Sequence, residues 1–246
     1  MKTIAIAAQK GGVAKTSTCA ALGLGLHKAG KRVLYVDLDA QHNLTDMLAD
    51  GETPFSVADV LTGFKGAAEA AVETPQGAII AASGALASKS IGTGREGLET
   101  LKNALQPIKK RFDVALLDCP PALGGMTDAA MIAADALILP VKADRFSWAA
   151  LTEIAGNIDR MNGKRTGKAL EVLGVLPVMY NPRATANKFT LEAIEEQAKA
   201  LGFRMFPPIR RSVSVEEMQY GNDLYSGKSG AASDYMRIVE AILRKI

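Results

Sequence analysis

Residues 9–17 read Gln-Lys-Gly-Gly-Val-Ala-Lys-Thr-Ser, and they follow directly on an apolar run at residues 3–8. A glycine-rich segment between a buried strand and a helix turns backbone N–H groups toward a phosphate. The strict pattern G-x-x-x-x-G-K-[ST] is not met, because Gln9 and Ala14 stand at its two glycine positions. Lys10 precedes the glycine pair instead, which gives the form K-G-G-x-x-K-[ST]. The segment therefore predicts a phosphate cradle with an additional lysine.

The side chains of this cradle suit a nucleotide with its metal ion. Lys15 would neutralise the β- and γ-phosphate oxygens, the Thr16 hydroxyl would complete Mg²⁺ coordination, and Ser17 would donate to the α-phosphate. We expect the nucleotide to contact the whole segment, which consists of Lys10, Gly11, Gly12, Val13, Ala14, Lys15, Thr16 and Ser17.

Short apolar runs recur along the chain, with room for a helix between them. They lie at residues 3–8, 33–36, 114–117, 136–139 and 172–178, and helix-like stretches lie at 16–30, 147–161, 188–201 and 231–246. This alternation predicts an α/β fold, with a mostly parallel twisted sheet and helices on both faces, in a single domain over residues 1–246. For residues 51–97 we expect helices and loops with one short strand at 78–82.

The composition narrows the functional classes. No apolar run is long enough for a membrane helix and no signal-peptide pattern opens the chain, so we expect a cytosolic protein. Cys19 and Cys119 are far apart in the sequence, which argues against a disulfide framework, a zinc site or a cysteine-held iron–sulfur cluster. Residues 163–246 hold 13 Lys and Arg against 9 Asp and Glu, whereas residues 1–162 hold 16 against 17. A local basic excess attracts polyanions.

Three aspartates come at the ends of predicted strands. Asp37 and Asp39 end the second strand, where the period of two puts both carboxylates on one side, and Asp118 ends the third. The carboxyl ends of parallel strands meet at the edge of the sheet where ligands bind. We therefore expect these acids beside the cradle, with Asp118 holding a Mg²⁺-bound water in the manner of a Walker B aspartate.

The motifs K-G-G-V-A-K-T-S from Lys10, V-D-L-D-A-Q-H-N-L-T from Val36 and L-L-D-C-P-P from Leu116 have the order and spacing of the ParA/Soj/MinD ATPases. The likeness continues at 127–135, 175–183 and 209–213, so it covers nearly the whole chain, which resembles a short ParA of the Soj type. We expect a protein without the helix-turn-helix segment that precedes the first strand in longer plasmid ParA proteins. The resemblance implies a P-loop NTPase fold with a deviant Walker A motif.

The resemblance assigns roles to individual residues. It implies that Lys10 reaches across a homodimer to the partner's ATP, that Asp39 positions the attacking water, and that Asp37, Asp118 and Thr16 lie on the metal side. The expected cofactors are ATP and Mg²⁺, and intrinsic turnover should be slow. The resemblance extends the nucleotide site beyond the cradle to Asp118, Asn181, Pro182 and Arg183.

The resemblance also implies partners. In this family the ATP-bound dimer binds double-stranded DNA without sequence preference, and a ParB-type protein that binds a centromere-like site accelerates hydrolysis. Lys188 matches a family arginine that contacts DNA, Arg211 lies in the segment that matches I-P-R-N-V-R, and Arg210 and Arg183 are neighbouring candidates. We therefore expect a nucleoid-associated cytoplasmic protein that segregates DNA and has no membrane partner.

Four positions depart from the family pattern. Ala40 and His42 stand where D-x-D-P-Q-G-N has proline and glycine, Ser214 stands where a second DNA-binding arginine is expected, and Asp128 replaces a frequent asparagine. A loop without that proline and glycine samples other backbone conformations, so hydrolysis and switching could differ from those of relatives. His42 is better interpreted as a polar loop residue than as a catalytic base.

Three alternatives stay open. A MinD-like membrane ATPase would use the amphipathic pattern at residues 231–246 as a membrane-binding helix, although the same pattern suits docking on the chain's own domain. A metabolic enzyme of the superfamily, such as a nitrogenase-type reductase or a dethiobiotin-synthase-like ligase, is a second class, but the two cysteines are poorly placed for a shared cluster. A positioning ATPase with a protein complex as cargo would use the same ATP switch.

Overall fold

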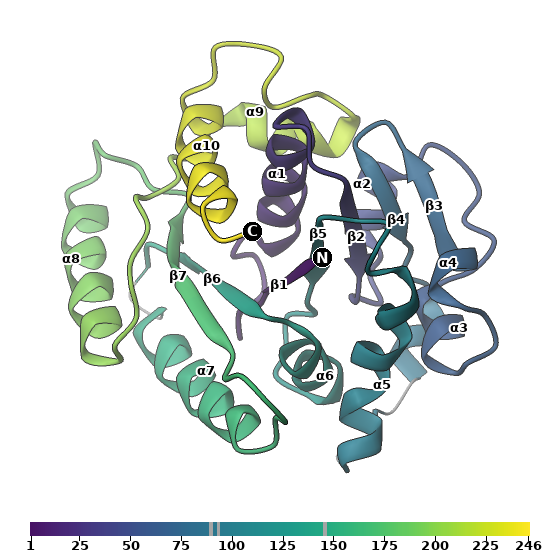
Figure 1. The fold of residues 1–246 in the computed structure, drawn as a ribbon. Coiled ribbons are helices and arrows are strands. Elements are labelled where there is room, and N and C mark those ends of the chain that lie inside the picture. The colour runs from purple at the N-terminus through teal and green to yellow at the C-terminus, as the bar shows by residue number, and fades with distance from the viewer. Residues whose placement is uncertain (89–90, 93, 145–146) are drawn as a thin grey trace.

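The computed structural model describes residues 1–88, 91–92, 94–144 and 147–246, and its centre is a twisted sheet (Figure 1). Within these residues the sheet has seven strands in the order β3-β4-β2-β5-β1-β6-β7. The strands are β1 Lys2–Ile6, β2 Val33–Asp37, β3 Ala71–Thr74, β4 Gly77–Ile80, β5 Val114–Asp118, β6 Ala136–Lys142 and β7 Glu171–Val178. Only β3 pairs antiparallel with its neighbour β4, and the other pairs are parallel. The expected α/β fold is confirmed.

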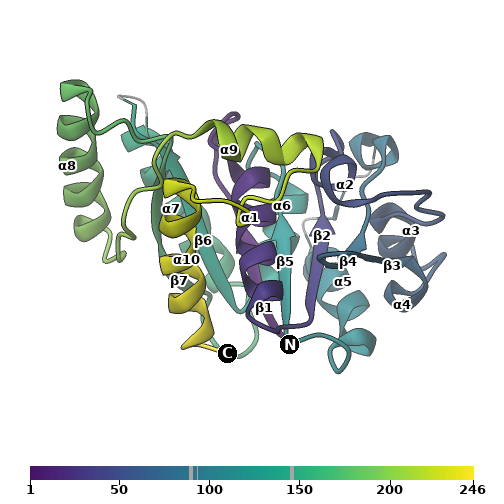
Figure 2. The same cartoon turned by 90° about the horizontal axis from the view of Figure 1, so that it is seen from above.

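Helices cover both faces of the sheet (Figures 1 and 2). They are α1 Lys15–Lys28, α2 Asn43–Leu48, α3 Val57–Leu61, α4 Ala67–Ala70, α5 Arg95–Leu105, α6 Gly125–Ala133, α7 Ser147–Asn162, α8 Thr185–Ala200, α9 Val213–Glu216 and α10 Gly230–Leu243, with short 3₁₀ turns η1 Gly84–Ser88, η2 Gln106–Ile108 and η3 Glu217–Tyr220. The buried residues form two clusters, one on each face. The helices α1, α2 and α10 contribute to one cluster, and α3, α5, α6, α7 and α8 contribute to the other.

The strand order brings the predicted acids to one edge. The apolar run of β1 lies between β5 and β6, so the cradle that follows β1 comes out beside the end of β5. In the pairing of β2 with β5, Asp37 lies opposite Asp118. The parallel sheet therefore places two of the three aspartates side by side next to the cradle.

Helix α1 is held closely between the sheet and α10. A Cβ at Gly23 would come within 2.1 Å of the Tyr35 ring of β2, so only glycine allows this approach. On its other side, the Thr18 hydroxyl lies 3.1 Å from the Tyr235 hydroxyl of α10. The Tyr225 hydroxyl adds a hydrogen bond of 2.9 Å to the carbonyl oxygen of Ala21. The helix that begins at the cradle is thus fixed over most of its length.

The structure differs from the sequence-based expectation at residues 51–97. One strand was expected at 78–82, but Ala71–Thr74 and Gly77–Ile80 form an antiparallel hairpin at the edge of the sheet. Strand β3 has no fully buried residue, so it lacks the apolar signal that marks the other strands.

Both cysteines are buried and unpaired. No helix in the described part of the chain has the length and apolar character needed to cross a membrane.

Candidate nucleotide site

The cradle between β1 and α1 has two residues in the left-handed backbone conformation. Gly12 and Ala14 have φ angles of +67° and +54°, and Ala14 caps α1 in the left-handed conformation without a side-chain hydrogen bond to the helix. The first N–H groups of α1 therefore have no capping side chain among the described residues and point into the cradle. Such an uncapped N-terminus favours an anion.

Lys15 crosses the cradle with its ammonium almost out of solvent. Its exposed fraction is 7%, and its Nζ donates to the carbonyl oxygen of Lys10 at 3.3 Å. Burial lowers the pKa of Lys15, while the nearby Asp118, Cys119 and Asp39 act in the opposite direction. A carbonyl oxygen is a weak partner for this buried cation. A polyanion bound in the cradle would be a stronger one.

The Lys10 side chain pairs with Asp144, which lies two residues beyond the end of β6. Its Nζ lies 2.6 Å from Oδ2 of Asp144, and the two side chains are 37% and 24% exposed. The pair joins residues 134 positions apart in the sequence. Lys10 is therefore held by an acid that no local sequence pattern identifies.

The two paired aspartates have different surroundings. Oδ2 of Asp37 accepts hydrogen bonds from the N–H and the hydroxyl of Thr45 at 2.9 and 2.8 Å, and Oδ1 accepts from the Asp39 N–H at 3.1 Å. Burial still raises the pKa of Asp37. Asp118 is 1% exposed, and neither of its carboxyl oxygens has a hydrogen-bond partner among the described residues. Burial, with a further contribution from Asp37, raises the pKa of Asp118 to about 8, although the Thr16 hydroxyl and Lys15 oppose the rise.

These oxygens fit a magnesium ion that arrives with its ligand. Two buried carboxyl oxygens without partners are costly, and a divalent cation would satisfy them. No group of three or more His, Cys, Asp or Glu side chains in the described ranges is arranged to hold a metal by itself. Mg²⁺ commonly uses one or two carboxylates together with waters and substrate phosphates.

A cleft adjoins the start of α1 on the side of α10. The residues lining it include Ala14, Ser17, Met179, Ile209, Arg211 and Tyr235. Met179 and Ile209 were not predicted from the sequence, because their approach to the cradle depends on the pairing of two distant segments. Asn181, Pro182 and Arg183 do not line the cleft, although the turn that they form begins two residues after Met179.

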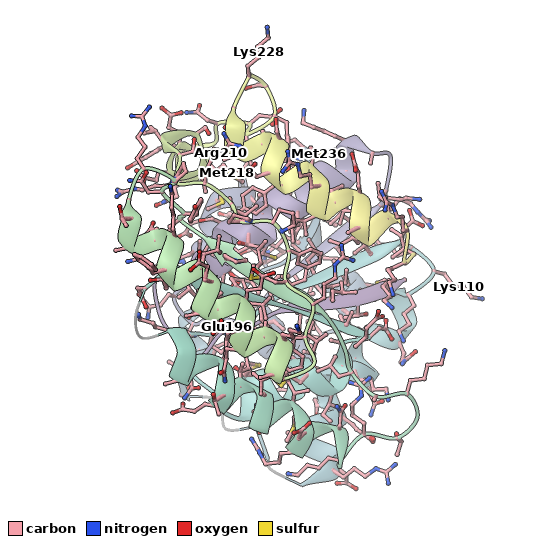
Figure 3. All side chains as sticks on the ribbon, turned by 90° about the vertical axis from the view of Figure 1, so that its left-hand side faces the viewer. Lys110, Glu196, Arg210, Met218, Lys228 and Met236 are labelled. Atoms are coloured by element: carbon pink, nitrogen blue, oxygen red, sulfur yellow. The ribbon has the colours of Figure 1, made fainter. Side chains whose placement is uncertain are left out.

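The predicted DNA-binding residues fall into two groups. Lys188 and Arg183 are exposed, and Arg211 is 73% exposed with its Nε 3.7 Å from Glu216. Arg210 instead forms a two-pronged ion pair with the buried Asp234 of α10, through Nε at 2.7 Å and a terminal nitrogen at 3.0 Å. Figure 3 shows Arg210 near the start of α10, while Lys228 extends from the preceding loop. The ion pair ties the 209–211 segment to α10.

Two of the departures from the family pattern have a structural partner. Ser214 belongs to a chain of hydroxyls, 2.7 Å from the Ser212 hydroxyl and 2.6 Å from that of Ser229. Asp128 is 5% exposed, and Arg160 of α7 pairs with both of its oxygens, at 3.1 and 3.0 Å. The acidic residue that replaces asparagine is thus neutralised locally.

The cradle, the buried lysine and the acids at the ends of β2 and β5 define a P-loop ATPase with a deviant Walker A motif. A family model described as an AAA domain matches residues 1–172. The chain is 32% identical over 257 residues to the chromosome partitioning protein ParA of Caulobacter vibrioides, covering all of this chain and 95% of that protein. The chain belongs to the ParA family of ATPases.

Two solved structures agree with this assignment. The ATP complex of a McdA variant from Cyanothece has a TM-score of 0.87 and 26% identity, over 98% of this chain and 96% of that one. Cobyrinic acid a,c-diamide synthase from Mycobacterium smegmatis, with bound ATP analogue and magnesium, has a TM-score of 0.86 and 31% identity, over 99% and 95%. The protein is accordingly an ATPase whose cofactors are ATP and Mg²⁺.

Proposed function

We propose that this ATPase is a DNA partition protein: with ATP it forms a sandwich dimer that binds duplex DNA without sequence preference, and a ParB-type partner accelerates hydrolysis. The observation that carries the proposal is the position of the exposed basic residues next to the nucleotide cleft. Tyr180 and Arg210 form a parallel bridge, and the Arg211 N–H donates to the Tyr180 carbonyl oxygen at 2.9 Å. The chain that leads into α8, the helix that carries Lys188, therefore lies beside the segment of Arg211, and the Arg211 segment lines the cleft.

In the proposed site each group acts where the geometry already holds it. The N–H groups at the start of α1 and the Lys15 ammonium bind the phosphates, and Thr16, Asp37 and Asp118 stand on the metal side. Bound Mg²⁺ would supply charge for the departing phosphate. The Asp39 carboxylate orients the attacking water, and its place is set by the N–H bond to Asp37. Hydrolysis then removes the charge that favours the dimer.

We infer that the ion pair of Lys10 with Asp144 belongs to the monomer, the resting state of the switch. In the proposed dimer Lys10 leaves Asp144 and reaches the partner's nucleotide. The γ-phosphate carries more negative charge than one carboxylate, so ATP favours this exchange more strongly than ADP does. The same exchange would couple dimerisation to the nucleotide state.

DNA binding tests the proposal directly. We expect binding to random-sequence duplex DNA with ATP, and little binding with ADP or without nucleotide. Because this binding rests on phosphate contacts, its logarithmic affinity should fall steeply with salt. Replacing Lys188 or Arg211 with alanine should lower the salt slope by about one for each contact removed. Fluorescence anisotropy across a salt series measures both quantities.

The matched control is Lys199→Ala, which removes the same charge from the exposed last turn of the same helix, α8. It should leave the salt slope unchanged. The main effect of Arg210→Ala should be a loss of thermal stability, because Arg210 pairs with a buried acid. Its effect on DNA affinity should be smaller than that of Arg211→Ala. Absence of DNA binding in every nucleotide state would reject the partition proposal and leave the ATPase assignment intact.

Asp39→Ala tests the hydrolytic role separately. We expect ATP binding close to that of the unchanged protein and hydrolysis at least about a hundred-fold slower, because an orienting group for the attacking water is gone. Size-exclusion chromatography with light scattering should then find a dimer that persists with ATP. Normal hydrolysis by this variant would remove Asp39 from the mechanism.

The amphipathic C-terminal helix gives little support to the membrane alternative. Tyr235, Ile238, Val239 and Ile242 of α10 are all 1% exposed or less, because this face packs in the cluster with α1. Pelleting with anionic liposomes and ATP would show whether α10 leaves this position.

A synthase is the second candidate, favoured by the likeness to the Mycobacterium smegmatis enzyme. A synthase should hydrolyse ATP only when its organic substrate is present. DNA-stimulated turnover by the purified protein alone would exclude it.

A further inference from the structure

The chain between β2 and α2 makes a β-turn around the proposed catalytic aspartate. The His42 N–H donates to the Asp39 carbonyl oxygen at 2.9 Å, and the Gln41 N–H donates to Oδ1 of Asp39 at 3.1 Å. The turn therefore includes the backbone and the carboxylate of Asp39. Any loosening of the turn would move the carboxylate.

This turn lacks two of the residues that favour a β-turn. β-turns favour aspartate at the first position, proline at the second and glycine at the fourth. Asp39 fills the first, but the second and fourth are Ala40 and His42. His42 has a φ angle of +47°, a left-handed conformation that is unfavourable for any residue with a Cβ. By backbone preference alone, this turn should be held more loosely than one with proline and glycine.

The His42 side chain supplies a contact that glycine could not make. Its Nδ1 lies 2.9 Å from Oδ2 of Asp46, one helical turn along α2, and the Asp46 N–H donates to the His42 carbonyl oxygen at 2.9 Å. Between them is Thr45, whose N–H and hydroxyl both bind Asp37. The contact between His42 and Asp46, called here the His42–Asp46 clasp, thus joins the Asp39 turn to the helix that holds Asp37.

We propose that His42 is a positioning residue for ATP hydrolysis: the His42–Asp46 clasp holds the Asp39 turn in place of the missing proline and glycine. The inference rests on the proposed role of Asp39. His42 itself touches neither substrate nor reacting atoms in this proposal. Its effect passes through the turn, so it should appear in kcat and leave the KM for ATP unchanged.

An incidental surface pair makes the opposite prediction. The two side chains are 47% and 63% exposed, and pairs of this kind often contribute little. If the clasp had no effect, His42→Gly would relieve the left-handed conformation and keep or raise kcat. The sign of the change therefore distinguishes the two interpretations.

The experiment compares steady-state ATP hydrolysis by the full chain and five variants. We expect His42→Gly and Asp46→Ala each to lower kcat about three-fold with unchanged KM, the size expected of an exposed pair. The matched control Asp50→Ala removes an exposed acid just beyond α2 and should match the unchanged protein. Adding Ala40→Pro to His42→Gly should return kcat to the starting value, because proline restrains the turn through its backbone.

The rescue is feasible because the Ala40 N–H makes no hydrogen bond within the described ranges. A kcat for His42→Gly equal to or above that of the unchanged protein would overturn the proposal, and so would a double variant that stays slow. Asp39→Ala in the same assay separates this from failure of the Asp39 assignment: if that variant hydrolyses ATP normally, the basis of the proposal is gone whatever His42 does.

Discussion

Replacing Lys15 with alanine is expected to weaken ATP binding by at least about a hundred-fold, the loss typical of a buried charged partner. The ammonium is almost fully buried and donates to a carbonyl oxygen of the described chain, a weak partner for a full charge, so its charge is available to a phosphate. Isothermal titration with ATP and Mg²⁺ measures the change. Tight ATP binding by this variant would reject the assignment of the cradle.

Lys10→Ala is the informative comparison, because it removes the other lysine of the same motif. Its ammonium pairs with Asp144 at 2.6 Å, on the β6 side of the cradle. We expect this variant to keep most of its ATP affinity as a monomer and to fail to dimerise with ATP. If both variants lost ATP binding equally, the separate roles of the two lysines would be wrong.

The parts of this site that the sequence predicts are those set by local pattern. Neighbouring residues in the chain identify the apolar run before Gln9, the glycine pair and the aspartates at the strand ends. The parallel sheet then places these features together. Strand β3 escaped prediction because it is a short edge strand with partly exposed residues, so neither burial nor alternation marks it.

The contacts that hold the site were not predictable, because they join distant segments. Asp144, the partner of Lys10, lies 134 residues from it in the sequence, and Asp234 lies 24 residues from its partner Arg210. The sequence interpretation grouped Arg210 with the DNA-binding residues, since an arginine in a basic segment has no local mark of a buried partner. Thr45 on Asp37 was missed for a related reason: its hydroxyl is one of many near loops, and only the fold selects it.

Asp118 is the residue whose charge should change most when Mg²⁺ and ATP bind. Its pKa is raised from 3.8 to about 8 in the fold, so near pH 7 the carboxyl is mostly protonated without the metal. Holding Mg²⁺ requires the ionised form. Binding of Mg²⁺ and ATP at pH 7 should therefore release close to one proton from this group, which titration calorimetry in buffers of different ionisation enthalpy can measure.

The same shift sets the direction of the stability change with pH. Below the unfolded-state pKa Asp118 is protonated in both states, but between about pH 4 and 8 the unfolded chain ionises it and the folded chain does not. Stability without ligand therefore falls as the pH rises through this window and levels off above pH 8. From pH 5 to pH 8 the loss is about 4 kcal/mol, or about 10 °C in Tm for a domain of this size.

Asp118→Asn removes this titration and with it the proposed metal ligand. The melting temperature of the variant, relative to the unchanged protein without nucleotide, should rise by about 10 °C between pH 5 and pH 8, while its ATPase activity falls at least about a hundred-fold. Other titrating groups cancel in the comparison, because both proteins carry them. A difference in Tm that stays flat with pH would mean that Asp118 is ionised in the free fold. Asp118 would then form an ion pair with Lys15, and the two charges would balance before ATP binds.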